Sequence, residues 1–145
     1  MAKINNNFKS FNQQFHFLSS RKFVALPHRG AHFFSKDNSD KYLENTHSAF
    51  SKAVELGFTH IETDVHSSKD SVPYVMHDPT LKRLTGENIA LKELTSKDIG
   101  KIRLKGSHVI PRLEETLEEF SSICFNIDAK SWEVTEPLAL SLIHI

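Results

Sequence analysis

The chain of 145 residues has a single cysteine and no excess of charge of either sign. Cys124 is the only cysteine, so neither an intramolecular disulfide nor a thiolate metal cluster can form, and a free thiol fits a reducing compartment. Lysine plus arginine number 18, as do aspartate plus glutamate, and no dense basic block occurs. This balance argues against a surface for nucleic acid or anionic membranes. The length suffices for one modest domain with a core of its own.

Long apolar runs are also missing. No stretch approaches the ~20 apolar residues that a membrane-spanning helix needs, and residues 1–14 hold no apolar core of the signal-peptide kind. We therefore expect a cytoplasmic protein, the alternative being export by a route that the sequence does not reveal. The polar residues 1–21 are expected to form a poorly ordered lead-in, and residues 22–145 a partial catalytic domain.

Strand-type and helix-type patterns alternate along that domain. Four short runs have the composition of strands: 23–26, 59–65, 73–77 and 124–130. Helices are predicted from Asn45 or Thr46 to Gly57, after Pro111 and from Thr135, with a capped turn at 95–98. This order is mostly that of a parallel α/β sheet.

Polar side chains recur at the carboxyl ends of the predicted strands. They are His28 and Arg29, Glu62 and Asp64, His77, and then Asp128 and Lys130. A parallel barrel gathers such ends on one rim, where its active sites lie, whereas an open doubly wound sheet typically binds ligands at its switch point. Four successive contributing strands favour a TIM-type (β/α)8 barrel.

The strand at 59–65 carries two carboxylates on one face. Because strand side chains alternate, Glu62 and Asp64 share a side, and burying both is costly without a counter-charge. A divalent cation would supply that charge, since hard cations favour oxygen ligands. His77 ends the next apolar run and could belong to the same site. The alternative is a solvated edge strand followed by a turn histidine.

The order of these motifs is similar to that of the glycerophosphodiester phosphodiesterases. The resemblance runs from about Phe23 to the C-terminus and rests on an ordered series of motifs. They are His28-Arg29-Gly30, Glu44-Asn45-Thr46, Ile61-Glu62-Thr63-Asp64-Val65, Lys69-Asp70, His77-Asp78-Pro79-Thr80-Leu81, Arg83-x-Thr85-Gly86, Ile110-Pro111-Arg112-Leu113-Glu114-Glu115 and Asn126-Ile127-Asp128-Ala129-Lys130.

The resemblance implies a TIM-type barrel enzyme of lipid and glycerol metabolism. Such an enzyme hydrolyses a glycerophosphodiester to glycerol 3-phosphate and an alcohol, usually with Ca²⁺ or Mg²⁺. By motif, the implied roles are metal binding for Glu62, Asp64 and Asp128, acid/base catalysis for His28 and His77, phosphate contact for Arg29 and Lys130, and support for Glu44. His66 is expected to support the ligands or to be exposed. Four further histidines are expected to be non-catalytic: His32, His47, His60 and His108.

The sequence departs from the family pattern in several places. Asp128 stands where many members have glutamate, Leu43 replaces a proline, and Ser71 replaces a glycine common after Lys-Asp. More importantly, a TIM barrel typically needs about 250 residues. The chain would then supply roughly the first half of the barrel, so we expect a truncated enzyme or a half that needs its missing C-terminal partner.

Two other functions stay open from the sequence. The chain could be a non-catalytic remnant that acts at most as an interaction module. It could also be a phospholipase D-like or phosphatidylinositol-phospholipase C-like enzyme, which uses similar histidine and metal chemistry on lipid headgroups. The lack of an evident lipid-docking segment argues against the latter.

Overall fold

The computed structural model describes residues 24–34 and 40–144, so the lead-in expected over residues 1–21 lies outside the described residues. The strands are β1 (His60–Ser67), β2 (Pro73–Val75) and β3 (Cys124–Ala129). The α-helices are α2 (His47–Glu55), α3 (Lys82–Thr85), α4 (Ser96–Ile99), α5 (Leu113–Glu119) and α6 (Thr135–His144). Single 3₁₀ turns are η1 (His32–Phe34), η2 (Asp40–Tyr42), η3 (Leu91–Glu93), η4 (Lys105–Ser107) and η5 (Trp132–Val134).

The sheet is mixed and has the strand order β2-β1-β3. β1 and β3 run parallel from the pair His60–Cys124 to the pair Val65–Ala129. β2 is antiparallel to β1, so the expectation of a parallel strand here was wrong. The physical reason is the short connection over residues 68–72, because a parallel crossover needs a dozen or more residues.

The first predicted strand is only partly confirmed. Residues 24–26 form no regular strand, and residue 23 is outside the described part of the chain. The segment nevertheless runs beside β1, since Glu62 donates its N–H to the Pro27 carbonyl at 3.2 Å and His28 forms a parallel bridge with Glu62. Pro27 has no N–H to continue a ladder, which explains why the pairing stays this short. Three parallel segments therefore lie in the order 24–28, β1, β3.

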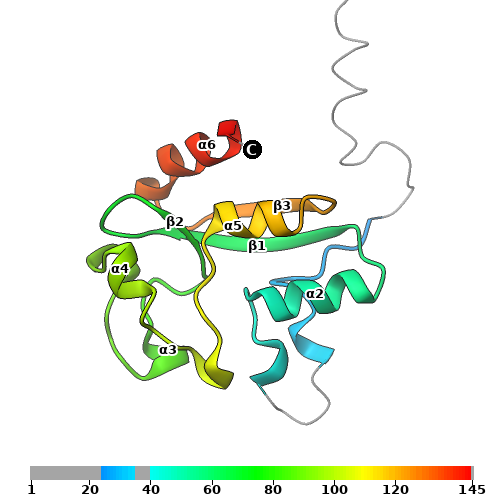
Figure 1. Ribbon diagram of the computed structural model, residues 1–145, viewed down its shortest axis with the longest axis horizontal. Helices are drawn as coiled ribbons and strands as arrows, with labels where there is room; N and C mark the ends of the chain where they lie inside the picture. The colour runs from blue at the N-terminus through cyan, green and yellow to red at the C-terminus, as the bar shows by residue number, and fades with distance from the viewer. Residues whose placement is uncertain (1–23, 35–39, 145) are drawn as a thin grey trace, which may run out of the picture.

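Two hydrophobic clusters hold the fold together. The first contains Phe50 of α2, Ile61 and Val65 of β1, and Leu113 and Phe120 at the two ends of α5. The second joins β2 to α3, α4 and the loops around them, through residues that include Met76, Leu84 and Ile99. Figure 1 shows the same division, with α3 and α4 lying together and α2 apart from them.

The predicted helices are confirmed with small changes at their ends. Thr46 is the N-cap of α2 and Gly57 follows the helix with a φ of 84°. The capped turn at 95–98 is α4, where the Asp98 N–H donates to the Thr95 hydroxyl at 3.3 Å. α5 begins after Pro111 and its Leu113 is fully buried, as its apolar stripe predicts.

The sheet stays open on the side of β3. In the described part of the chain β3 pairs only with β1, so its outer edge has no strand beside it. The following helix α6 exposes Leu140, Leu142 and Ile143. An open mixed sheet with helices is an α/β fold, and its parallel segments have the order of consecutive barrel strands. Among residues 24–34 and 40–144, no helix has the length and apolar character to cross a membrane.

Candidate active site

The carboxyl ends of the three parallel segments meet at one rim. The register of β1 and β3 places Glu62 opposite Asn126 and Asp64 opposite Asp128. The parallel bridge with Glu62 brings His28, and hence Arg29, to the same rim from the other edge of β1. Lys130 follows β3 directly, and its backbone N–H donates to the Val65 carbonyl at 3.1 Å. The rim therefore collects several of the residues that the sequence singled out.

Arg29 lies in a sharp turn at this rim. Its φ of 55° is in the left-handed region, which a long side chain rarely adopts. Its N–H donates to Glu62 Oε2 at 2.9 Å, its Nη1 to Glu44 Oε1 at 3.1 Å, and its Nε lies 3.2 Å from Asp64 Oδ2. These three contacts to carboxylates stabilise a backbone conformation that would otherwise be unfavourable.

Asp64 is the buried anion at the centre of the rim. It is fully buried and is approached by the ammonium of Lys130 at 2.8 Å, the amide of Asn45 at 2.8 Å and the guanidinium of Arg29 at 3.2 Å. Burial alone would raise the pKa of Asp64. The close approach of the Lys130 ammonium and the hydrogen bond from Asn45, with the charges of Lys130 and Arg29, outweigh burial and hold the pKa of Asp64 below its usual value. Asp64 is therefore an ionised carboxylate inside the protein.

Asn45 is a site residue that sequence reasoning interpreted only as a helix cap. Its Nδ2 donates to Asp64, its Oδ1 accepts from the Thr63 hydroxyl at 2.9 Å, and its φ of 56° is one that asparagine tolerates. The neighbouring Thr46 takes the N-cap position instead. The signal in the sequence was the Glu44-Asn45-Thr46 motif, but two adjacent capping-type residues do not reveal which one caps.

Two of the three expected metal ligands, Asp64 and Asp128, meet at a lysine. Lys130 Nζ lies 2.8 Å from Asp64 Oδ1 and 2.6 Å from Asp128 Oδ2, so its ammonium is the cation between the two carboxylates. Glu62 stays separate, bonded to the Arg29 N–H. Within residues 24–34 and 40–144, no three histidine, cysteine, aspartate or glutamate side chains gather closely enough to hold a metal ion.

The donor set nevertheless suits a hard cation. All the expected ligands are carboxylates, the ligands that Ca²⁺ and Mg²⁺ prefer. Asp64 Oδ1 is buried and, although Lys130 lies at ion-pair distance, it accepts no well-directed hydrogen bond. Asp128 is about half exposed. The residues therefore fit a metal in type, provided that the Lys130 side chain withdraws from between them.

The two expected acid/base histidines differ in their surroundings. His77 follows β2, and its Nδ1 lies 2.7 Å from Asp78 Oδ1. Since the pKa of Asp78 is held low, its carboxylate accepts a hydrogen bond from the Nδ1–H of His77, and among residues 24–34 and 40–144 no hydrogen bond engages Nε2. The His28 side chain is 62% exposed and its Nε2 lies 3.9 Å from Glu62 Oε2. No hydrogen bond or ion pair among the described residues joins His28 to His77.

A charged network that the sequence did not predict links these groups. Arg83, on α3, bonds both Asp78 and Glu44, and Glu44 in turn bonds Arg29. His66, which was expected to be exposed or supporting, is buried, and its Nε2 contacts the His77 carbonyl at 3.1 Å. Burial lowers the pKa of His66.

A hydroxyl, an imidazole and a carboxylate also line up elsewhere in the fold. His47 Nε2 lies 3.1 Å from Thr116 Oγ1, and its Nδ1 lies 2.7 Å from Glu119 Oε2. The order of atoms is that of a hydrolase triad. Thr116 is fully buried, however, and its hydroxyl donates to the Arg112 carbonyl at 2.8 Å. This hydroxyl cannot attack a substrate, so the cluster joins α2 to α5 instead.

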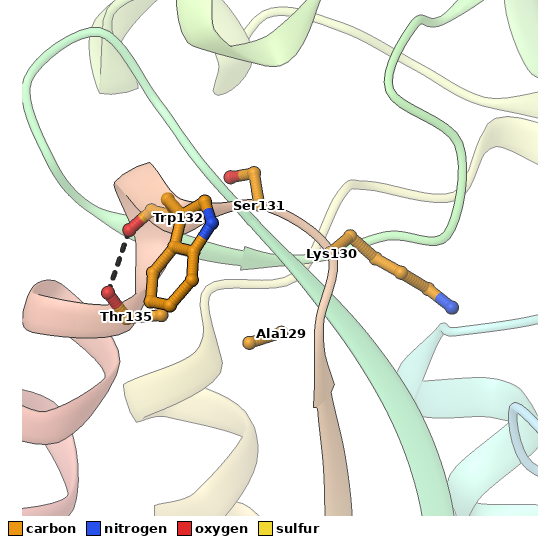
Figure 2. A pocket seen from close by; sticks show the side chains of 5 residues that line it. All are labelled: Ala129, Lys130, Ser131, Trp132 and Thr135. Atoms are coloured by element: carbon orange, nitrogen blue, oxygen red, sulfur yellow. Dashed lines mark hydrogen bonds between the residues drawn. The ribbon is translucent and has the colours of Figure 1, made fainter.

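Two cavities adjoin the rim at Lys130. One of about 130 Å³ lies between the ends of β1 and β3 and is lined by His66, Ser67 and Ser131 among others. The other, an open hollow of about 300 Å³, is lined by residues 129–132 and Thr135. Figure 2 shows the Lys130 side chain extending away from Trp132 in this hollow. Lys130 therefore borders both spaces while it contacts the carboxylates.

The fold defines a class of protein. Parallel segments with polar and charged side chains gathered at their carboxyl ends are typical of α/β barrels. Comparison with known proteins narrows the class. Residues 28–137 match the profile of the glycerophosphoryl diester phosphodiesterase family, and the chain belongs to that family.

Relatives and solved structures agree with this assignment. The chain is 34% identical over 114 residues to the probable glycerophosphodiester phosphodiesterase 2 of Mycobacterium tuberculosis, covering 79% of this chain and 41% of that protein. It is 33% identical over 112 residues to human lysophospholipase D GDPD1, covering 68% of this chain and 36% of that protein. The glycerophosphodiester phosphodiesterase structure from Thermotoga maritima superposes with a TM-score of 0.71 at 32% identity, over 83% of this chain and 50% of that one.

The chain thus spans about half of the solved structures and less than half of the curated relatives that it matches. Its α/β fold corresponds to about half of a TIM barrel of this family. A phosphodiesterase from Oleispira antarctica, 22% identical, was solved with the product sn-glycerol-3-phosphate. At that identity the likeness shows the fold alone.

Proposed function

We propose that the chain carries the phosphate-binding and acid/base rim of a glycerophosphodiester phosphodiesterase. The reaction would hydrolyse a glycerophosphodiester to glycerol 3-phosphate and an alcohol. The observation that carries this proposal is the convergence of two cations, Arg29 and Lys130, within 3.2 Å of the buried carboxylate of Asp64. Membership of the family supports the same reaction class.

The cations suit the charge of the substrate. A phosphodiester is anionic, and attack at phosphorus concentrates charge on its non-bridging oxygens. Groups held in place before the reaction stabilise such charge best. Arg29 is held by three carboxylates, so it is fixed without a substrate. Lys130 contacts two carboxylates, from which it would withdraw when a metal binds. A phosphate oxygen can then take over contacts that Lys130 makes with the exposed Asp128.

The histidines would move the protons. One removes a proton from the attacking water or from a substrate hydroxyl, whose oxygen bonds to phosphorus as the bond from phosphorus to the leaving oxygen breaks, and the other protonates that leaving oxygen. If a substrate hydroxyl attacks, the product is a cyclic phosphate, which water then opens to glycerol 3-phosphate. His77 is suited to either role, because Asp78 fixes its ring through Nδ1 and leaves Nε2 available. His28 is suited by its exposure at the rim.

A metal would add to this charge stabilisation. The family typically depends on a metal ion. We propose Glu62, Asp64 and Asp128 as the residues that would hold Ca²⁺ or Mg²⁺. The ion, when bound, supplies Lewis-acid stabilisation of the phosphate oxygens.

A second candidate is a half-barrel that is inactive by itself. The observations that favour it are the unpaired outer edge of β3, the exposed apolar residues of α6 and the coverage of about half of the related barrels. The rim would then acquire activity only when a second half completes the barrel.

One assay distinguishes the candidates. We would measure the release of glycerol 3-phosphate from glycerophosphocholine, with Mg²⁺, Ca²⁺ or chelator, by the chain alone and by the chain fused to the second half of the Thermotoga maritima relative. Lysophosphatidylcholine serves as the alternative substrate. The proposal predicts activity in the fusion that needs metal and is lost in His77→Ala. Arg103→Gln is the matched control, because among the described residues Arg103 donates hydrogen bonds only to backbone carbonyls.

The outcomes separate cleanly. Activity in the fusion but not in the chain alone selects the second candidate. A folded fusion that is inactive with both metals, or a His77→Ala variant as active as the parent, contradicts the proposed function.

A further inference from the structure

Arg83 uses all three guanidinium nitrogens to bind two carboxylates from different loops. Its Nε donates to Asp78 Oδ2 at 2.6 Å, its Nη2 to Glu44 Oε1 at 2.6 Å and its Nη1 to Glu44 Oε2 at 3.1 Å. The pair with Glu44 is the bidentate type that fixes geometry as well as charge. Asp78 follows β2, whereas Glu44 precedes α2, so Arg83 ties together two separate parts of the rim.

The Asp78 end of this link reaches His77. Asp78 presents one oxygen to Arg83 and the other to His77 Nδ1 at 2.7 Å. Burial would raise the pKa of Asp78, but the bonds from Arg83 and His77 outweigh it and hold the pKa below its usual value. An ionised Asp78 whose position is fixed by Arg83 selects the tautomer of His77 that carries its proton on Nδ1.

The Glu44 end of the link reaches Arg29. Glu44 Oε1 accepts from Arg83 Nη2 and also from Arg29 Nη1 at 3.1 Å. Arg29 continues to Asp64, the buried carboxylate of the rim. One carboxylate, Asp78, thus connects Arg83 to His77. Another, Glu44, connects it to Arg29.

We propose that Arg83 is a positioning residue that holds His77 and Arg29 in register with each other. It does so by fixing Asp78 and Glu44 at the same time. The inference rests on the proposed function for the roles of His77 and Arg29.

A lone surface salt bridge would not perform this task, because exposed pairs typically contribute little. Here the Arg83 side chain is 47% exposed, but both of its partners are well covered: the Glu44 side chain is 12% exposed and that of Asp78 19%. Lysine at position 83 would keep the charge, but one ammonium has no fork with which to bind both oxygens of Glu44 and Asp78 together.

The test uses nuclear magnetic resonance on the intact chain and needs no turnover. Long-range ¹H–¹⁵N spectra report the tautomer of His77, and the Arg29 Nε–H signal reports the order of that guanidinium. His77→Gln and Arg29→Lys identify the two signals. Because neither readout depends on catalysis, a failure here is distinguishable from a failure of the proposed function.

Three variants give different expectations. Arg83→Gln should convert His77 from the Nδ1–H form to a mixture of tautomers and should also shift or broaden the Arg29 signal. Asp78→Asn should change His77 but leave Arg29 as it is, because Glu44 still binds Arg83. Arg103→Gln should change neither, and the signals of His47, which bonds Glu119 and Thr116, should stay constant in all three as a check on folding.

Arg83→Lys is a control for general loss of structure, because it keeps the positive charge. It should still disturb the His77 signal, the Arg29 signal or both. The inference is overturned if Arg83→Gln leaves both His77 and Arg29 unchanged, or changes only one of them. It is also overturned if Arg83→Lys behaves as the parent at both positions.

Discussion

Substitution of Gly30 tests whether the turn at Arg29 packs against α2 as the structure shows. The residue has a φ of 81°, and a Cβ added to it would lie 2.9 Å from Ala49 Cβ and 3.0 Å from Phe50 Cδ1. Gly57 has almost the same φ, 84°, but a Cβ there would meet nothing within 4 Å. Gly30→Ala and Gly57→Ala therefore share the backbone strain and differ in the space that the new methyl group finds.

The magnitudes follow from that difference. Replacing glycine by alanine at a left-handed φ strains the backbone but also lowers the entropy of the unfolded chain. The net loss in the free energy of unfolding is about 1 kcal/mol, which we expect for Gly57→Ala. Gly30→Ala adds a methyl group to the fully buried Ala49 and Phe50, and such overpacking costs about 1–3 kcal/mol more. We therefore expect a loss of roughly 2–4 kcal/mol for Gly30→Ala.

Urea unfolding followed by circular dichroism measures both variants against the parent. The difference between them, rather than either loss alone, reports the close packing of the turn on α2. Equal losses of stability in the two variants would refute the reasoning, because the structure assigns the clash to Gly30 only.

Further predictions concern the charges of the rim and one turn. The pKa values of Glu44, Asp64 and Asp78 are below those of the unfolded chain, so their contribution to stability is present above about pH 4 and is lost as pH falls through the folded-state values; urea midpoints at pH 7 and pH 3 should show this loss. Asp64→Asn should cost about 3 kcal/mol at neutral pH and clearly less at pH 3, because it leaves two cations without their buried partner; equal costs at both pH values would contradict this. Ser71→Gly should raise stability by about 0.5 kcal/mol, since Ser71 has a φ of 61°; a decrease in the urea midpoint would contradict it. Lys130→Gln should lower the melting temperature in chelator and increase the gain from added Ca²⁺, because the ammonium between Asp64 and Asp128 no longer competes; an unchanged gain would argue against metal binding there.

Local patterns predicted most of the elements of the fold. The helical period of α2, the capped turn of α4 and the strand composition of β1 and β3 are each specified within a few residues, and the structure confirms these elements. The alternation of faces does not appear in the burial of β1, because the strand is buried on both faces. The direction of β2 was predicted wrongly, although the short turn at 68–72 was in the sequence and excludes a parallel crossover. The interruption at Pro27 likewise follows from its missing N–H.

The contacts inside the site could not be predicted in the same way. Arg83 and Glu44 are 39 residues apart, and nothing local indicates that they meet. The position of Lys130 between Asp64 and Asp128 depends on the parallel register of β1 and β3. Motifs indicated which residue types belong to the rim, whereas the pairing among them is a property of the assembled sheet.

The central claim is that this rim cleaves a glycerophosphodiester, and release of glycerol 3-phosphate from glycerophosphocholine tests it most directly. For the chain fused to a completing second half-barrel, we predict release that requires Mg²⁺ or Ca²⁺, is lost in His77→Ala and is retained in Arg103→Gln. A folded fusion that releases no glycerol 3-phosphate with either metal, or that does so equally well without His77, would contradict the account.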